Sequence, residues 1–249
     1  RNRVFYSSHD VTPLLSDGTN VIGAVVTSGW YSGGIAHGMY GSDKDLGLIA
    51  KLVLTYDDGT EDVIVTDGSW EVSRNGGLQF SEIYNGEVYD ARKTVDWTNP
   101  DSETMSWKPV TINTLYSGKI ECFKGPYVQV LKNLIQPPKT ATVYLGSKPD
   151  GSDWGMVNVI KTQSGTSPVV LKKGETVIFD FGQNVVGWWD FTVKGNSGTR
   201  LHMQCSEMLN DDGKKSRGND GPGGSLYLVN LRSARAEIYY TLRGDQAGE

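Results

Sequence analysis

Short apolar runs separated by turn sequences make up most of the chain. The runs 46–56 and 61–66 flank Asp57-Asp58-Gly59-Thr60, and an Asp-Gly pair between two such runs is a strong signal for a β-hairpin. Asp67-Gly68 marks the next turn, and residues 69–73 then alternate between outward and inward side chains as a strand does. Turns this short at this spacing predict antiparallel sheets that close into a β-sandwich or a jelly roll.

Further apolar runs predict the remaining strands. The run 21–26 is continuous and rich in β-branched residues, which is typical of a strand buried on both faces. The other predicted strands are 4–8, 119–123, 142–145, 156–161, 176–181, 188–194, 200–206 and 236–242. The sequence contains no long amphipathic helix pattern and no internal repeat.

Glycine and proline divide the chain into two halves. Gly125-Pro126 and Pro137-Pro138 interrupt the strand pattern, and we place a domain boundary near Gly125. The sequence therefore predicts an all-β fold of two antiparallel, jelly-roll-like β-sandwich domains, 1–124 and 125–249.

Three polar segments interrupt the predicted strands. Residues 83–92 match neither helix nor strand, and we predict that they leave the sheet as a long irregular segment. Residues 28–34 are rich in glycine and place Trp30 and Tyr31 at a sheet edge. Residues 210–224 are polar and rich in glycine, which predicts a mobile loop. Because loops often carry function, the first two segments are candidate ligand surfaces.

The composition suits an all-β protein and argues against two kinds of partner. The 31 glycines, 7 tryptophans and 12 tyrosines fit short strands, many turns and aromatic-lined surfaces. A net charge of -5 argues against a nucleic-acid partner, because a surface that follows phosphates needs clustered Lys and Arg. No apolar run approaches the roughly 18 residues that span a membrane, so we predict no membrane partner. The first residue is not Met, so we expect that a natural N-terminus has been lost, which leaves periplasmic, secreted and cytoplasmic locations open.

Cysteine and histidine give no sign of a metal or nucleophile site. Cys122 and Cys205 lie far apart, and we predict two buried thiols instead of a disulfide framework. His9, His37 and His202 are scattered, which predicts packing or surface residues. The sequence also lacks a phosphate-binding loop, a dinucleotide fingerprint and a nucleophile elbow.

Residues 83–92 combine the groups that orient a polyol. Tyrosine rings supply flat, half-polar faces. Carboxylates and amides supply directional hydrogen bonds. With the two aromatic residues of the glycine-rich segment, they form the set of candidate substrate-binding residues: Trp30, Tyr31, Tyr84, Asn85, Glu87, Tyr89 and Asp90.

Glu87 and Asp90 raise the question of catalysis. A glycosidase needs two carboxyl groups, about 5–5.5 Å apart for retention or about 6.5–9.5 Å for inversion, and one of them needs a raised pKa. Arg92 is expected to lower the pKa of a neighbouring acid instead. We therefore favour a role in fixing the backbone or in binding, and we assign no catalytic residue.

Calcium is a candidate ion for the same segment. Asn85, Glu87 and Asp90 offer hard oxygens, and a bound Ca²⁺ can bridge protein and sugar hydroxyls. Three oxygens are too few for a full coordination shell, so the metal ligands stay unknown. No cofactor is expected to be required.

Residues 179–189 contain a second polar motif. Asp180, Gln183 and Asn184 can tie a turn together through bonds from side chain to backbone, which predicts a structural turn. The alternative is that Gln183, Asn184 and Trp188 face a neighbouring domain or a sugar.

Short motifs follow one another in a specific order along the chain. The first set is Asp10-Val11-Thr12, Asn20-Val21-Ile22-Gly23, Gly29-Trp30-Tyr31, Asp58-Gly59-Thr60, 66–70 and 86–92. The second set is 180–184, Gly187-Trp188, Glu207-Met208-Leu209, Gly213 and 240–244. In this order, the first set resembles the N-terminal β-sandwich of the bacterial α-L-rhamnosidases, glycoside hydrolase family 78. The second set resembles the concanavalin-like β-domain of the same family.

The resemblance implies part of an enzyme that acts on rhamnosides. In this family an (α/α)6 barrel carries the acidic pair for inverting hydrolysis of terminal α-L-rhamnose, and its motifs are not found in this sequence. We also expect the first sandwich to lack its upstream strands and the second to lack its closing Trp-x-Pro and Gly-Phe-Arg-Tyr segments. The chain is thus expected to be a non-catalytic portion that supports the barrel, with L-rhamnose-containing glycans or glycosides as ligands.

Two other hypotheses remain open. Some family members use the first sandwich as a calcium-dependent rhamnose-binding module, so the chain is alternatively a stand-alone, lectin-like module that binds L-rhamnose. A complete enzyme that uses Glu87 and Asp90 is the third hypothesis, and the neighbouring Arg92 argues against it.

Overall fold

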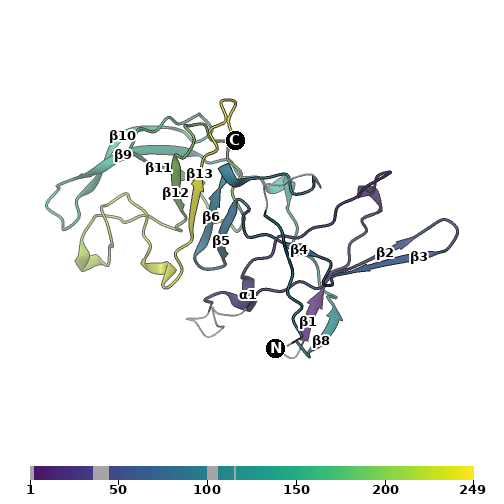
Figure 1. Ribbon diagram of the computed structural model, residues 1–249. Helices are drawn as coiled ribbons and strands as arrows, with labels where there is room; N and C mark the ends of the chain where they lie inside the picture. The colour runs from purple at the N-terminus through teal and green to yellow at the C-terminus, as the bar shows by residue number, and fades with distance from the viewer. Residues whose placement is uncertain (1–2, 36–44, 100–105, 115) are drawn as a thin grey trace. The chain divides into compact units, whose positions relative to one another are not determined.

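The computed structural model describes residues 3–35, 45–99, 106–114 and 116–249, so His37 lies outside the described residues. The chain forms two compact units. Unit 1 consists of Arg1–Tyr127, Val193–Met203 and Glu237–Glu249, and unit 2 of Val128–Thr192 and Gln204–Ala236. Figure 1 shows strands and loops throughout the described residues, with α1 (Gly29–Ser32) as a single turn of α-helix. The prediction of an all-β fold is confirmed, while the domain boundary near Gly125 remains a prediction.

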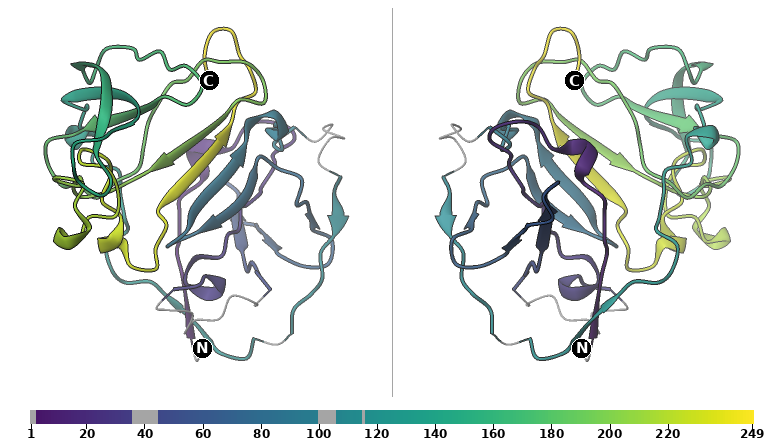
Figure 2. Two further views of the ribbon diagram at one scale, coloured as in Figure 1. Left: turned by 90° about the vertical axis from the view of Figure 1, so that its left-hand side faces the viewer. Right: turned by 90° about the vertical axis from the view of Figure 1, so that its right-hand side faces the viewer.

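Unit 1 is built on a four-stranded sheet with the order β12-β13-β6-β5. The strands are β5 (Leu78–Glu82), β6 (Gly86–Asp90), β12 (Arg200–Gln204) and β13 (Glu237–Thr241). β5 runs antiparallel to β6, whereas β13 runs parallel to it. Figure 2 shows the yellow β13 between the green β12 and the blue β6. The sheet therefore joins the middle of the chain to its end.

β6 corrects the prediction of an irregular segment at 83–92. Gly86 to Asp90 pairs residue by residue with Glu237 to Thr241, and it also pairs with β5. Gly86 has a φ of 90°, a conformation that glycine adopts readily, and this lets the chain turn into the strand. The strand was missed because its parallel partner lies far along the chain, where no local pattern indicates it.

The other strands of unit 1 pair in twos. They are β1 (Arg3–Tyr6) with β8 (Lys119–Cys122), β2 (Lys51–Thr55) with β3 (Glu61–Val65), and β4 (Glu71–Val72) with β7 (Lys108–Pro109). The first pair is parallel and the other two are antiparallel. Two parallel pairs thus accompany the predicted antiparallel ladders.

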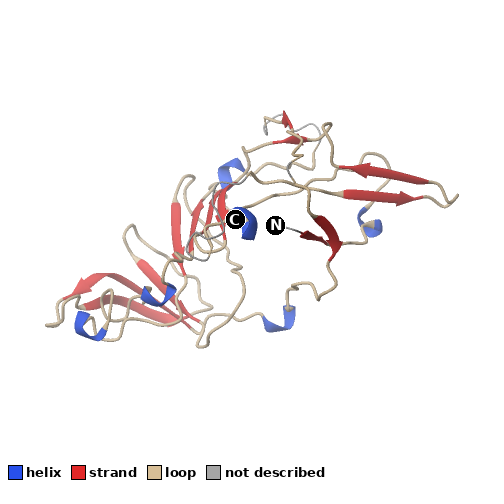
Figure 3. Cartoon of the chain, turned by 90° about the horizontal axis from the view of Figure 1, so that it is seen from below, coloured by secondary structure: helices blue, strands red, loops and turns tan. Residues whose placement is uncertain are grey.

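The β2–β3 hairpin forms at the predicted Asp-Gly turn. Its register runs from Lys51 opposite Val65 to Thr55 opposite Glu61. The side chain of Asp58 accepts a hydrogen bond of 2.9 Å from the N–H of Thr60, which closes the turn. Figure 3 shows the two strands as a long paired ribbon.

Two predicted strands do not form. Residues 21–26 have no regular structure, and Val21, Ile22 and Val25 are exposed. Residues 188–194 also lack regular structure, and Val193 exchanges backbone hydrogen bonds of 2.8 and 2.9 Å with Glu249. An apolar run indicates burial, but a strand also needs a continuous ladder of paired residues, and among the described residues neither run forms one.

Unit 2 contains a three-stranded sheet with the order β10-β9-β11. The strands are β9 (Thr140–Lys148), β10 (Met156–Ser164) and β11 (Thr176–Asp180). Both pairings with β9 are antiparallel. Ala141 and Val143 of β9 are buried, so this central strand carries the core of the sheet.

Short 3-10 turns occur in both units. Among the described residues they are Thr12–Leu14, Ala91–Lys93, Lys132–Leu134, Lys215–Arg217 and Val229–Leu231. No helix in the described part of the chain is long and apolar enough to cross a membrane.

The loop 210–224, which follows β12, is anchored by hydrogen bonds. This corrects the prediction that the loop is mobile. Asn210 is only 2% exposed. Its amide Nδ2 donates to Ser225 Oγ and to the carbonyl of Leu226, each at 3.0 Å. Its Oδ1 accepts a bond of 3.0 Å from the N–H of Asp220. One fully bonded amide thus ties both ends of a polar loop, which composition alone does not indicate.

The prediction of two buried thiols is wrong. Cys122 and Cys205 are both exposed and unpaired to each other. Cys122 ends β8, a strand of a two-stranded sheet, where little covers it. Partial burial still raises the pKa of the Cys205 thiol above its ordinary value.

Candidate functional site

The turn between β5 and β6 is organised by one buried carboxylate, that of Glu82. Its residue is 7% exposed. Oε2 accepts hydrogen bonds from the backbone N–H of Tyr84 at 3.1 Å and of Asn85 at 2.7 Å. Two charge-assisted bonds from the backbone fix the turn and orient the two candidate residues that it carries.

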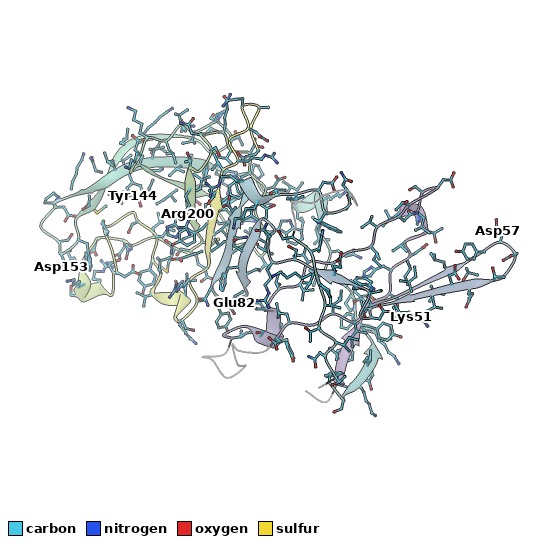
Figure 4. The ribbon with its side chains drawn as sticks, viewed as in Figure 1. Lys51, Asp57, Glu82, Tyr144, Asp153 and Arg200 are labelled. Atoms are coloured by element: carbon cyan, nitrogen blue, oxygen red, sulfur yellow. The ribbon has the colours of Figure 1, made fainter. Side chains whose placement is uncertain are left out.

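The same carboxylate contacts the glycine-rich segment of α1. A Cβ added to Gly33 would lie 2.8 Å from Glu82 Oε1 and 2.5 Å from the carbonyl oxygen of Gly29. Only glycine permits so close an approach, because any side chain would displace both oxygens. Figure 4 places Glu82 at the end of β5, next to α1. Glu82 therefore joins the two segments that carry the predicted ligand surfaces.

Oε1 of Glu82 has no hydrogen-bond partner. It is the one such buried side-chain atom found among the described residues. An unpaired buried oxygen on a charged group is costly, and in native proteins it usually calls for a donor from water, an ion or a ligand. The sequence offered no signal for Glu82, because no local pattern distinguishes its carboxylate from one that is exposed to solvent.

The aromatic residues of α1 lie on the surface, in the segment that approaches this carboxylate at Gly33. Trp30 is 57% exposed and Tyr31 is 41% exposed, while Tyr84 is half-buried. Tyr84 and Asn85 bind Glu82 through their backbone N–H groups, and Trp30 and Tyr31 belong to the segment whose Gly33 approaches it. We call this set the Glu82 cluster.

The remaining three candidate residues lie along β6 and do not share one face. Side chains alternate along a strand, so Glu87 and Tyr89 point to one face of the sheet and Asp90 to the other. The Tyr89 ring stacks on Tyr240 of β13, with centroids 5.6 Å apart. Glu87 and Asp90 therefore cannot act together on one glycosidic bond.

Asp90 is held by Arg92. Its Oδ1 accepts from the Arg92 backbone N–H at 3.1 Å and from Nε at 2.9 Å, and its Oδ2 accepts from Nη2 at 2.8 Å. The Arg92 hydrogen bonds hold the pKa of Asp90 below its ordinary value. The predicted locking role is confirmed for Asp90, whose pKa is shifted in the wrong direction for a general acid.

The predicted oxygen ligands of calcium do not converge. Asn85 lies in the turn at Glu82, while Glu87 and Asp90 lie on opposite faces of β6. Within the described residues, no group of three or more His, Cys, Asp or Glu side chains is placed to hold a metal ion. The set Asn85, Glu87 and Asp90 therefore does not fit Ca²⁺, which needs six to eight oxygens.

The turn motif of unit 2 is structural at Asp180. Its Oδ1 accepts a bond of 2.6 Å from the N–H of Gly182, as predicted. Asn184 Nδ2 donates to Glu207 Oε1 at 3.2 Å, and Trp188 is 65% exposed. The alternative, that Gln183, Asn184 and Trp188 face another domain or a sugar, stays a prediction.

The pKa of Tyr240 lies above the ordinary value of a tyrosine. Burial, followed by a hydrogen bond to Glu249, raises its pKa to about 12. Because the folded pKa lies above the ordinary value of about 10, its contribution to stability is complete below about pH 10 and is lost as the pH rises through about 12. Tyrosinate absorbance should show one late step that is missing in Tyr240→Phe. A single step near pH 10 in the unmodified chain would contradict this.

Comparison with known proteins identifies the family. Residues 1–132 match the α-L-rhamnosidase N-terminal domain family, and residues 171–249 match the bacterial α-L-rhamnosidase concanavalin-like domain family. The chain belongs to the α-L-rhamnosidase family, as its motifs predicted.

Individual relatives agree with this assignment. The chain is 31% identical over 248 residues to an α-L-rhamnosidase of Streptomyces avermitilis, covering 98% of this chain and 20% of that protein. The structure of a Streptomyces avermitilis α-L-rhamnosidase complexed with L-rhamnose is similar with a TM-score of 0.63 at 27% identity, covering 89% and 18% of the two chains. The structure of an α-L-rhamnosidase from Dictyoglumus thermophilum is similar with a TM-score of 0.61 at 25% identity. That match covers 98% of this chain and 22% of the other. The chain spans about a fifth of the length of the curated relatives it matches.

Proposed function

We propose that this chain is the non-catalytic β-portion of an α-L-rhamnosidase. The full-length protein would release terminal non-reducing α-L-rhamnose from rhamnosides, with inversion. The observation that carries the proposal is the match of both halves of the chain, in order, to two α-L-rhamnosidase domain families.

The geometry of the acidic residues supports a non-catalytic role. An inverting pair needs one carboxyl group with a raised pKa facing a second across the substrate. Glu87 and Asp90 lie on opposite faces of β6, and the pKa of Asp90 is lowered. The reaction is therefore assigned to the rest of the full-length protein, for which the family resemblance implies an (α/α)6 barrel. The two β-units would support that barrel.

The test compares two proteins on an aryl α-L-rhamnoside. We expect a protein extended through the C-terminal region to release the aryl group and the 249-residue chain to show no turnover. Proton NMR of the first sugar released would show the β-anomer, as inversion requires. An inactive, folded extended protein would overturn the assignment. Turnover by the short chain would overturn its non-catalytic role.

The Glu82 cluster favours a second function, the binding of L-rhamnose. A sugar site combines aromatic faces with a few convergent polar groups, and the residues of this cluster supply both kinds of group. The unpaired Oε1 of Glu82 would accept a hydrogen bond from a sugar hydroxyl. One solved relative was crystallised with L-rhamnose, which makes that sugar the first ligand to try.

Glu82→Gln is expected to weaken L-rhamnose binding by about five- to tenfold, because a bond to a charged acceptor becomes a neutral one. The amide keeps the size of the side chain and one acceptor for the turn. Calorimetry with L-rhamnose, in the presence and absence of a chelator, measures the effect. Glu87→Gln on the sheet face is the control and should bind as the unmodified chain does. No heat from the unmodified chain in either condition would contradict the binding function.

A further inference from the structure

The sequence contains two Asn-Gly pairs, and both lie in unit 1. They are Asn75-Gly76, which lies between β4 and β5, and Asn85-Gly86, which leads into β6. The side-chain amide of asparagine is open to attack by the backbone nitrogen of the next residue, and asparagine is one of the thermolabile residues for this reason. A following glycine favours the attack, because the absence of a Cβ lets the backbone approach closely. The sequence therefore makes the two pairs equally susceptible.

The fold clamps the second pair. The N–H of Asn85 donates to Glu82 Oε2 at 2.7 Å, and its carbonyl accepts from the N–H of Glu237 at 3.4 Å. Gly86 lies opposite Glu82 of β5 and opposite Glu237 of β13. The Gly86 nitrogen can reach the Asn85 amide carbon only if the backbone between them rotates, and that rotation would break these pairings. Reaction at Asn85 therefore requires local opening of the sheet.

The first pair is held more loosely. Asn75-Gly76 lies in a bend outside the ladders of β4 and β5. The N–H of Asn75 donates to Ser73 Oγ at 3.1 Å, and the Gly76 carbonyl accepts from Gln79 Nε2 at 2.5 Å. Both of these partners are side chains, which can change rotamer. The backbone of this pair can therefore rotate without unpairing a strand.

We propose that Asn75 is a site of spontaneous deamidation and that the fold protects Asn85 from the same reaction. The Gly76 nitrogen loses its proton and forms a bond to Asn75 Cγ, and the side-chain nitrogen leaves as ammonia. The product is a cyclic imide. Water then adds to one of the two carbonyl carbons of the imide and breaks its bond to the nitrogen, which gives aspartate or isoaspartate. Water is the only co-reactant, and nothing is oxidised or reduced.

The isoaspartate product would disturb the start of β5. It lengthens the backbone by a methylene group just before Gly77, which is buried. The Gly77 carbonyl accepts from the N–H of Asp90 at 2.8 Å, and a Cβ on Gly77 would lie 2.8 Å from Tyr89 Cζ. So close a fit leaves no room for the longer backbone. Deamidation of Asn75 would thus loosen the β5–β6 pair, and this inference is independent of the proposed function.

The test follows both asparagines in the intact 249-residue chain. The chain is aged at mildly alkaline pH, which promotes loss of the Gly76 proton. A short digestion with trypsin cuts after Arg74 and Arg92, so that one peptide, 75–92, carries both pairs. Fragmentation in a mass spectrometer then locates the mass increase that replacement of NH2 by OH causes. We expect Asn75 to convert at least about tenfold faster than Asn85 in the folded chain, and at a similar rate in denaturant, where the clamp is lost.

Two variants separate the reaction from its consequence. Gly76→Ala should slow the conversion of Asn75 several-fold, because a methyl group hinders the approach of the nitrogen, and its thermal unfolding should match that of the unmodified chain. Asn75→Asp is the matched control for the consequence, since it carries the new charge on a backbone of normal length. The aged fraction that contains isoaspartate should lose exchange protection at the Asp90 amide, whereas Asn75→Asp should keep it.

Three results would overturn the proposal. They are retention of the Asn75 amide as the chain ages, conversion of Asn85 as fast as Asn75 in the folded chain, and a ratio of the two rates that denaturant leaves unchanged. Full protection of the Asp90 amide in the isoaspartate fraction would overturn the effect on the β5–β6 pair. None of these results bears on rhamnose release or rhamnose binding, so they leave the proposed function to its own tests.

Discussion

Gly86→Ala is expected to destabilise unit 1 by about 3 kcal/mol or more. A Cβ on Gly86 would lie 1.9 Å from the carbonyl oxygen of Glu237. In addition, Gly86 has a φ of 90°, which strains any other residue. The neighbour is backbone, not the end of a flexible side chain, so β6 and β13 must move apart and lose ladder hydrogen bonds. Hydrogen exchange at the amides of Glu237 to Thr241, together with thermal unfolding, measures the effect.

Gly59→Ala separates steric clash from backbone strain. Gly59 also has a positive φ, of 83°, but nothing lies within 4 Å of its missing Cβ. Strain alone predicts a loss of about 1 kcal/mol there. Equal effects at both positions would show that β6 does not approach β13 as closely as described.

Asn210→Ala is expected to destabilise unit 2 by about 3 kcal/mol. The substitution removes three hydrogen bonds from a residue that is 2% exposed. It also leaves the Leu226 carbonyl and the Asp220 N–H without these partners in a region that is shielded from water. Loss of exchange protection at Asp220 and Gly224, which donates to the Asn210 carbonyl at 2.7 Å, would report the release of the loop.

Asn20→Ala is the matched control for this effect. Asn20 also makes several local hydrogen bonds, to Ser16 and Gly18, but it is exposed. Water replaces those bonds when the side chain is removed, so a loss of no more than about 1 kcal/mol is expected. Asn210→Ala with an equally small effect would contradict the anchoring role.

The two carboxylates of residues 83–92 show how a local pattern misleads. Glu87 and Asp90 are close in sequence and looked like a pair. An offset of three residues places them on one side of a helix but on opposite sides of a strand, so the secondary structure decides the chemistry. The expectation that Arg92 lowers the pKa of Asp90 is confirmed. It depended only on the two residues being close in the chain, so the sequence was enough to predict it.

The sequence predicted the elements that depend on interactions between residues close together in the chain. The Asp58-Gly59 hairpin, the Asp180 turn and most strand positions follow from turn residues and alternation within a few residues. The family also followed from sequence, because ordered motifs survive even where each one is weak alone. Predictions failed where a partner far along the chain was decisive, as at 21–26 and 188–194.

The sequence by itself determined the all-β class, the Asp58-Gly59 hairpin and the family, and it predicted two segments in which to look for ligands. Only the tertiary structure decided that β6 lies between β5 and β13, that Glu82 joins the two segments, and that Arg200 stacks on Tyr239. The reason is physical. Turn and strand propensities act between neighbours in the chain, whereas sheet register, burial and the pairing of charges depend on residues that only folding brings together.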